Sequence, residues 1–339
     1  MSRAAEASYP SRPDESGPLP SAEAFERRLE EGRRLGEALL AGLSDAIHGQ
    51  QATLTHVVTC LLAGGHVLLE GAPGLGKTQI VRTLAALVDG SFARIQFTPD
   101  LMPSDVLGTS LVSTDGDGRR DFRYREGPIF ANLVLADEIN RATPKTQSAL
   151  LEAMGERTVS VDGRPRPLPD PFFVLATENP IEMEGVFPLP EAQLDRFLMK
   201  LVLGMPSLEA LTQIGARPSE PARPAPITDT VTLARAAQTA RHVAAAPHVL
   251  SYAARLVAGS HALPEVRYGA GPRAVQALMA CGRVRAMLDG RPAVGVADVR
   301  AVAPHVLGHR VVLGFEAEAR GRRAPDVVGA LLETVAEAP

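Results

Sequence analysis

The feature that most constrains this chain is a glycine-rich stretch, Gly71 to Thr78, which directly follows an apolar run. The stretch reads Gly-Ala-Pro-Gly-Leu-Gly-Lys-Thr, and the run before it is His66-Val67-Leu68-Leu69-Glu70. Apolar residues then recur at helical spacing from Ile80 to Val88, so the order is strand, loop, helix. Glycines let such a loop curl its N–H groups, together with the helix N-terminus, around an anion. The pattern therefore predicts a phosphate-binding loop.

Lysine usage supports this interpretation. Of the 35 basic residues only Lys77, Lys145 and Lys200 are lysines, and the rest are arginines. A compact ammonium group can enter a phosphate cradle in a way that a planar guanidinium cannot. We therefore expect Lys77 to reach the β- and γ-phosphates of a nucleotide and the Thr78 hydroxyl to ligate Mg²⁺.

Polar residues follow two further apolar runs. One run, 132–136, ends in Asp137-Glu138, and another, 172–177, is followed closely by Asn179. After a phosphate loop, this arrangement predicts that Asp137 positions Mg²⁺ through its water shell and that Glu138 polarises the attacking water. Asn179 either orients the same water or serves as a turn-forming residue.

The order of elements predicts the fold class. Strands alternate with helices over residues 45–205, which is typical of a parallel α/β sheet with helices on both faces and ligands at the carboxyl ends of its strands. Two inserts interrupt this order. We expect one hairpin within 101–130, around an Asp-Gly-Asp-Gly turn at 115–118, and another within 155–170. Inserts of this kind are commonly functional.

Composition divides the chain into four parts. Residues 1–20 are rich in Pro and Ser and are predicted to be a disordered tail. Residues 21–205 form the predicted nucleotide-binding α/β domain, and the prolines of 206–228 indicate a linker. Residues 229–339 have helical spacing throughout, so a small all-helical lid domain is expected to follow the sheet.

Two features of this helical region need interpretation. Arg273 lies in the first turn of a helix that begins at Pro272, where the helix dipole disfavours a cation. It either binds an anion such as a nucleotide phosphate or is simply solvated. His305 and His309 are four residues apart, but Gly308 interrupts the helix and no third ligand is visible, so we expect surface histidines rather than a metal site.

Composition also excludes several classes of partner. The net charge of −4 gives no global attraction to nucleic acid or to an anionic membrane, so protein partners are favoured. Cys60 and Cys281 match no metal spacing and are expected to be buried free thiols. There is no long apolar run and no apolar signal core, so we expect a cytoplasmic protein without membrane insertion.

Taken in order, the motifs of the chain resemble those of the MoxR family of AAA+ ATPases, within the helix-2-insert clade. The resemblance covers about residues 25–335. The stretches Thr98 to Asp105 and Asp137 to Ala142 separate it from other AAA+ groups. The other matching motifs are Ile47-His48-Gly49-Gln50, Gly71 to Thr78, Glu126 to Phe130, Ala176 to Pro180, Leu194-Asp195-Arg196-Phe197 and Gly271-Pro272-Arg273-Ala274.

The resemblance implies a hexameric ring that uses ATP and Mg²⁺ for chaperone-like remodelling of a client protein. In this family the partner is often a von Willebrand factor A-domain protein, and some members mature metal-cofactor enzymes. The two inserted hairpins would face the ring centre and contact the client.

The same likeness implies roles for individual residues. Asn179 matches the first sensor, Arg196 the arginine finger, and Arg273 the second sensor, which serves its own or a neighbouring subunit's nucleotide. Lys77 with Thr78 and Asp137 with Glu138 match the two Walker motifs. The residues expected to contact the nucleotide are Gly49 and Gln50 beside the adenine, with Gly71, Ala72, Pro73, Gly74, Leu75, Gly76, Lys77, Thr78 and Gln79 around the phosphates.

The leading hypothesis is therefore ATP hydrolysis in a ring that remodels a client. One alternative is a nucleotide-gated binding scaffold in which hydrolysis is incidental, although an intact Glu138 argues against it. The other is a nucleic-acid-translocating motor. The tip of the first insert carries Asp115 and Asp117 but also Arg119 and Arg120, so its charge is mixed rather than basic.

Overall fold

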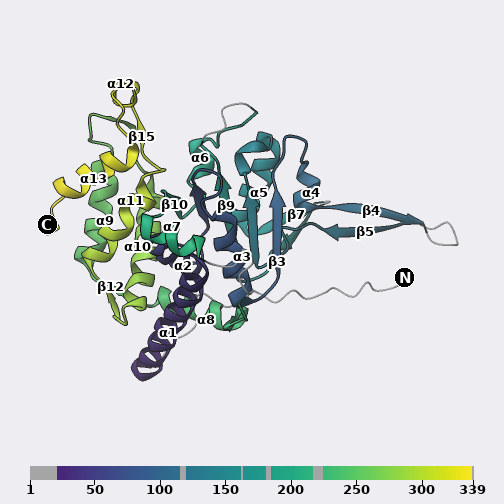
Figure 1. Cartoon of the computed structure of the whole chain (residues 1–339), viewed down its shortest axis with the longest axis horizontal. Coiled ribbons are helices and arrows are strands. Elements are labelled where there is room, and N and C mark those ends of the chain that lie inside the picture. Colours follow the sequence, from purple (N-terminus) through teal and green to yellow (C-terminus); the bar gives the residue numbers. More distant parts are fainter. Residues whose placement is uncertain (1–20, 115–119, 162, 181–184, 217–223, 338–339) are drawn as a thin grey trace.

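The computed structural model describes residues 21–337 apart from 115–119, 162, 181–184 and 217–223 (Figure 1). The tail expected at 1–20 and the Asp-Gly-Asp-Gly turn expected at 115–118 lie outside the described residues. In the part of the chain that is described, no helix is both long enough and apolar enough to cross a lipid bilayer.

A five-stranded sheet lies at the centre of the nucleotide-binding half, with the strand order β10-β1-β9-β6-β3. All of its neighbouring strands run parallel, which confirms the predicted α/β fold. In chain order its strands are β1 (Val67–Glu70), β3 (Phe92–Gln96), β6 (Leu133–Asp137), β9 (Phe173–Glu178) and β10 (Met199–Val202).

The two faces of the sheet bury different side chains, because successive residues of a strand point to opposite sides. In β6, Leu133 and Leu135 join one core cluster, while Val134 and Ala136 join the other. The first cluster includes the helix that follows the phosphate loop, and the second includes the helix after Asp137-Glu138. The inner strands β1, β6 and β9 are therefore buried on both faces, as their continuous apolar runs predict, whereas the edge strands β3 and β10 are only partly buried.

Helices surround this sheet and form the lid (Figure 1). Those of the first half are α1 (Ala22–Ala46), α2 (Gln51–Leu62), α3 (Lys77–Leu87), α4 (Pro103–Leu107), α5 (Pro144–Glu156) and α6 (Glu191–Leu194), with a 3-10 turn at Ile139–Arg141. Those of the lid are α8 (Thr230–Arg241), α9 (Pro247–Ser260), α10 (Pro272–Leu288), α11 (Val296–Leu307), α12 (Phe315–Ala319) and α13 (Ala324–Thr334).

Both inserted segments contain an antiparallel hairpin. The first pairs β4 (Gly108–Thr114) with β5 (Arg120–Glu126), and Figure 1 shows it projecting away from the sheet. The second pairs β7 (Thr158–Val161) with β8 (Arg164–Pro167) and follows α5 directly.

The segment expected to be a Pro-rich linker contains a helix, α7 (Leu208–Gly215). It begins where the Ser207 side chain accepts a hydrogen bond from the Ala210 N–H at 3.2 Å, a typical N-cap. Short strands also occur that the helical pattern did not predict. They pair β2 (Val88–Asp89) with β11 (Thr228–Asp229), β12 (Ala244–Ala245) with β14 (Ala293–Val294), and β13 (Val266–Tyr268) with β15 (Val312–Leu313).

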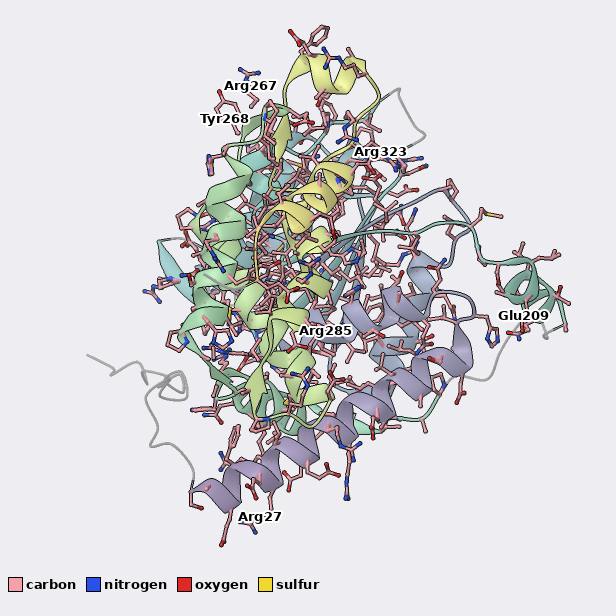
Figure 2. The ribbon with its side chains drawn as sticks, turned by 90° about the vertical axis from the view of Figure 1, so that its left-hand side faces the viewer. Arg27, Glu209, Arg267, Tyr268, Arg285 and Arg323 are labelled. Atoms are coloured by element: carbon pink, nitrogen blue, oxygen red, sulfur yellow. The ribbon has the colours of Figure 1, made fainter. Side chains whose placement is uncertain are left out.

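The lid shares one hydrophobic core with the first face of the sheet. Helix α1 makes part of this connection, and Figure 2 shows it running past the lid with Arg27 near its N-terminal end. Gly32 and Gly36 let α1 approach α10 closely. A Cβ atom on Gly36 would lie 2.0 Å from the Leu288 side chain, and one on Gly32 would lie 2.6 Å from Met287 Sδ. A larger residue at either position would require the Leu288 or Met287 side chain to move.

The core contains both cysteines and approaches or buries several histidines. Cys60 and Cys281 are buried and free, as expected. The expectation that His305 and His309 lie at the surface is wrong for His309, which is buried, while His305 is half-buried. The His305 ring is 4.2 Å from the His56 ring, and His309 is 7% exposed, because α11 packs between the lid core and β10.

A third histidine, His66, is buried at the start of β1. Its Nδ1 accepts a hydrogen bond from the Val174 N–H at 3.0 Å, and its Nε2 lies 3.4 Å from the Met154 carbonyl oxygen. An imidazole that accepts at Nδ1 is neutral. Burial lowers the pKa of His66 to about 3, and the charge of Arg157 contributes to the shift.

We predict that this histidine makes the fold sensitive to acid. Unfolded His66 takes up a proton below its ordinary pKa of 6.5, whereas the folded side chain stays neutral down to a pKa of about 3. The free energy of unfolding should therefore fall as the pH drops from 6.5 toward 3. Between pH 7 and pH 5 this one group should cost roughly 2 kcal/mol.

Urea unfolding at pH 7 and pH 5 measures this cost. In His66→Asn the loss between the two pH values should be smaller than in the wild type by about that amount. His248→Asn, which removes an exposed histidine, is the control. An equal acid loss in His66→Asn and the wild type would contradict the prediction.

Candidate functional site

A pocket lies at the carboxyl ends of β1, β6 and β9, where the first turn of α3 meets them. This is the edge of a parallel sheet where ligands commonly bind. Its lining brings together most of the residues singled out from the sequence. They are Pro73, Gly74, Leu75, Gly76, Lys77, Thr78, Gln79, Asp137, Glu138 and Asn179, and they are joined by Arg82, Arg94 and Gln96.

The glycine-rich loop presents its backbone to this pocket. Gly74 and Gly76 have φ values of +83° and +82°, a region that side chains disfavour. A Cβ atom on either residue would have nothing within 4 Å, so the space beside both glycines is open. Gly76 is also the N-cap of α3, whose free N–H groups point at the opening. A chain of phosphates fits this cradle.

Two side chains of the loop lie where phosphate and metal chemistry would need them. Lys77 Nζ donates a hydrogen bond to the Ala72 carbonyl oxygen at 3.2 Å and another to that of Gly71. Thr78 Oγ1 is 3.5 Å from Asp137 Oδ2. A hydroxyl beside a carboxylate is an oxygen donor set of the kind that Mg²⁺ takes, so these two residues fit that ion.

Asp137 is a buried carboxylate, 6% exposed, with partners from several elements. The Thr177 hydroxyl of β9 donates to its Oδ1 at 2.7 Å. The Arg94 guanidinium of β3 donates to its Oδ2 at 2.7 Å. These bonds compensate for the loss of water around a buried charge and fix the direction in which the carboxylate points.

Glu138 has an unusual backbone conformation, with a φ of +58°. Its N–H donates to Thr177 Oγ1 at 2.9 Å, and its carboxylate accepts from Gln96 Nε2 at 3.0 Å. Arg141 Nε lies 3.1 Å from the same carboxylate. A non-glycine residue in the left-handed region costs on the order of 1–3 kcal/mol, and such strain commonly occurs at functional sites. The contacts hold Glu138 facing the pocket.

Sequence reasoning missed Arg94, Gln96 and Thr177. The signal for the first two was present in β3, where an arginine and a glutamine alternate with the apolar Ala93 and Ile95. Parallel pairing sets Gln96 beside Asp137 in register. The sequence does not say that β3 is the neighbour of β6, however, and without that knowledge these side chains indicate only the solvated face of an edge strand.

Asn179 lies at the end of β9 and is 3% exposed. The preceding residue, Glu178, faces Lys200 of β10, whose Nζ lies 3.6 Å from Glu178 and 2.6 Å from Glu70. Burial raises the pKa of Glu178, and the charge of Lys200 opposes this. Burial lowers the pKa of Lys200, but the nearby carboxylates of Glu178 and Glu70 outweigh this effect, so the pKa is raised. Lys200 therefore forms ion pairs with carboxylates of two other strands, which is a structural role.

Some predicted residues do not line this pocket. Gly71 and Ala72, at the start of the loop, instead accept hydrogen bonds from Lys77 Nζ at their carbonyl oxygens. Gln50 Nε2 donates to the Gly204 carbonyl oxygen at 3.0 Å, and Gly49 lies against Pro206 and Ala210. Arg196 and Arg273 are both among the described residues, but neither lines the pocket. Arg273 pairs with Asp195, just before β10, and the Arg196 guanidinium lies beside Gly155 of α5.

Comparison with known proteins identifies the family. A model of the ATPase family associated with various cellular activities (AAA) matches residues 66–199, and a model of the AAA lid domain matches residues 260–331. The chain is 44% identical over 301 residues to chaperone MoxR1 of Mycobacterium tuberculosis, which covers 86% of this chain and 79% of that protein. The chain belongs to the MoxR family of AAA+ ATPases. It is therefore an ATPase with a nucleotide-binding site.

Three further proteins are similar to the chain over most of its length. Protein YeaC of Bacillus subtilis is 46% identical over 284 residues, or 82% of this chain and 87% of that one. Protein MoxR of Methylorubrum extorquens is 32% identical and covers 86% of this chain and 92% of its own. The crystal structure of a candidate ATPase from Cytophaga hutchinsonii superposes with a TM-score of 0.84 and 34% identity, covering 93% of this chain and 98% of that one.

We predict that Thr177 supports the acid pair of this ATPase. Thr177→Val keeps the shape of the side chain but removes the hydroxyl that donates to Asp137 and accepts from Glu138 N–H. Two buried polar groups then lose a partner, at a cost of about 1–3 kcal/mol in the free energy of unfolding. Looser orientation of the two acids should also lower the ATP turnover rate by about tenfold or more.

The matched control is Thr59→Val, which removes an equally buried hydroxyl whose bond goes to the Thr55 carbonyl oxygen, away from the pocket. It should lower stability but not turnover. Chemical unfolding and a steady-state phosphate-release assay measure the two effects. Equal turnover in the two variants would show that Thr177 is not part of the site.

Proposed function

We propose that this ATPase hydrolyses Mg²⁺-ATP at a site shared by two subunits of a ring and uses the cycle to remodel a client protein. One observation carries the proposal. The loop, the acid pair and Asn179 line a single pocket, whereas Arg196 lies outside it. Arg196, as the arginine that stabilises the transferred phosphoryl, would then have to reach it from another copy of the chain.

In this mechanism each side chain has a distinct task. The loop N–H groups and Lys77 hold the β- and γ-phosphates, and Gly49 with Gln50 border the adenine. Thr78 and Asp137 would hold Mg²⁺, which withdraws charge from the phosphate oxygens when it is bound. Glu138 accepts a proton from, or orients, the water that attacks the γ-phosphorus.

The remaining tasks belong to residues at the edge of the site. Asn179 aligns the attacking water with the phosphorus. Arg196 of the neighbouring subunit meets the charge that develops on the phosphoryl oxygens. Arg273, which is 65% exposed in its side chain, approaches the nucleotide across the same boundary.

The first hairpin is our proposed client contact. It projects from the body of the protein (Figure 1), and Leu111 and Val112 on it are 48% and 55% exposed. Apolar side chains exposed on a projecting element are typical of a protein-binding site. The name of chaperone MoxR1 is in keeping with such a role for its relative. A hexameric ring, a von Willebrand factor A-domain partner and a cytoplasmic location complete the proposal.

We predict that Arg196→Ala will bind ATP with wild-type affinity but hydrolyse it about 10³-fold more slowly or worse, as expected for loss of an arginine finger. Lys77→Ala should lose nucleotide affinity instead. Because the finger acts on a neighbour, mixed rings of the two variants should recover part of the activity. The intact Arg196 of a Lys77→Ala subunit would then serve the intact loop of an Arg196→Ala subunit.

Binding of a fluorescent ATP analogue and steady-state turnover measure these effects, with Arg241→Ala as the control that removes an exposed arginine elsewhere. Full turnover of the wild type at dilutions where it is monomeric would refute a shared site. So would an Arg196→Ala variant that no mixture rescues.

We predict that the hairpin is needed for client binding and not for hydrolysis. Glu138→Gln should retain ATP and accumulate client complexes that cross-linking captures. Adding Leu111→Ser and Val112→Ser should remove those complexes, whereas in an otherwise wild-type chain the same pair should leave basal turnover unchanged. Val231→Ser with Leu250→Ser removes two other exposed apolar side chains and is the control.

Two results would count against this proposal. Undiminished capture by the hairpin variant would move client binding elsewhere. Unchanged client remodelling by Glu138→Gln, with turnover abolished, would favour the scaffold alternative over an ATP-driven remodeller.

A further inference from the structure

Arg310 is a buried arginine of the lid, between α11 and β15, with a side chain that is 4% exposed. Its guanidinium does not face the lid alone. It reaches the segment that precedes strand β10, where Asp195, Arg196 and Phe197 follow one another. Figure 1 shows α11 and β10 where the lid and the sheet meet.

The guanidinium binds this segment at several atoms. Its Nε donates to Asp195 Oδ1 at 2.8 Å, and its Nη2 donates to the Phe197 carbonyl oxygen at 2.7 Å. Its Nη1 donates to the Leu198 carbonyl oxygen at 3.2 Å, and Nη2 lies 3.4 Å from the carbonyl oxygen of Asp195. A planar fork of donors can satisfy such a set of acceptors at once, which a lysine cannot do.

Two further lid residues approach the same segment. His309 Nε2 lies 3.1 Å from the Phe197 carbonyl oxygen, and Arg273 Nη1 of α10 pairs with Asp195 Oδ2 at 3.4 Å. The Asp195 carboxylate therefore bridges Arg310 inside the protein and Arg273 at its surface. We call Arg310, Asp195 and the carbonyl groups of Phe197 and Leu198 the lid clamp.

The lid clamp encloses Arg196. Its contacts fix the backbone on both sides of that residue, and the Arg196 side chain lies along α5, where a Cβ on Gly155 would be 1.9 Å from Arg196 Nη1. Gly155 thus leaves the space that the guanidinium takes. Among the described residues Arg196 has no carboxylate partner, so its direction depends on this backbone and this packing.

We propose that Arg310 is a positioning residue for the ATPase reaction: by holding residues 195–198 against the lid, it sets the direction in which Arg196 is presented to the neighbouring subunit. This inference rests on the proposed function of Arg196 as a shared-site arginine. Movement of the lid in one subunit would then be transmitted to the hydrolysis site of the next, because the Arg310 guanidinium joins the lid to the backbone on either side of Arg196.

A purely structural role for Arg310 makes a different prediction. If the clamp only attaches the lid, its loss should weaken the fold and the subunit's own nucleotide binding. If it positions the finger, its loss should spare nucleotide binding and slow hydrolysis in the neighbouring site. A mixture of variants separates these effects, since it reports which subunit is defective.

The experiment uses full-length Arg310→Lys, which keeps the charge but loses the fork. Alone, it should bind the fluorescent ATP analogue within about twofold of the wild type and turn over ATP at least about tenfold more slowly. Mixed with Lys77→Ala, it should recover activity, because the Lys77→Ala subunits bring a well-placed Arg196 to its intact site. Arg196→Ala mixed with Lys77→Ala is run in parallel.

Arg300→Lys is the matched control. Arg300 is another arginine of the lid, and its fork binds the Leu332 carbonyl oxygen at 2.8 Å and the Tyr252 hydroxyl at 3.2 Å, within the lid alone. It should leave turnover unchanged. Asp195→Asn is the second test variant, for use if Arg310→Lys unfolds at a lower temperature than the assay. It keeps an acceptor for Arg310 but removes the charge, and it should show the same pattern with a smaller loss.

Three results would overturn the inference: wild-type turnover in Arg310→Lys and Asp195→Asn, loss of nucleotide binding together with turnover, or no recovery on mixing when Arg196→Ala does recover. The last result would leave the shared site intact and remove only the role of Arg310. If Arg196→Ala also fails to recover, the shared site itself is wrong and the role of Arg310 falls with it.

Discussion

The burial of one carboxylate, that of Asp137, governs the arrangement of the nucleotide site. A charged group with so little exposure must be met by hydrogen-bond donors, and these come from strand β9 through Thr177 and from strand β3 through Arg94. Thr78, at the start of α3, faces the same carboxylate. Each partner belongs to an element beside β6, so the strand order and register of the parallel sheet decide the geometry of the site. A slip of one residue would turn these side chains to the opposite face.

The lid is attached to this sheet by two kinds of interaction. A continuous apolar core runs from the first face of the sheet through α1 and α2 into the lid helices. This core holds the lid and the sheet together, but apolar contacts are non-directional and do not fix the orientation of individual groups. The contacts of Arg310 with residues 195–198 are directional, because they are hydrogen bonds to named acceptors. This segment includes Arg196, and its Asp195 also pairs with Arg273 of the lid. The backbone on either side of Arg196 is thus fixed by a buried lid residue, outside the pocket that Lys77 lines.

Much of the fold and part of the site could be predicted because the signals are local. The phosphate loop lies between a strand and a helix that adjoin it in sequence, and Asp137 with Glu138 ends an apolar strand, so neither depends on distant partners. Arg94 and Gln96 could not be predicted, since their meaning depends on which strand lies beside β3. His305 and His309 were misjudged for a similar reason: His305 packs against His56 of α2 and His309 against the Phe197 carbonyl group before β10, and neither partner is near them in the chain.

The sequence by itself determined the parallel α/β class, the helical character of the lid and the residues of the phosphate loop and acid pair, because periodicity and short motifs act over a few residues. Only the tertiary structure decided which partners satisfy Asp137 and which lid residue grips the backbone around Arg196. Those contacts join residues about 40 and more than 100 positions apart. Such pairings arise from strand order and helix packing, which minimise the free energy of the whole chain rather than of any one segment.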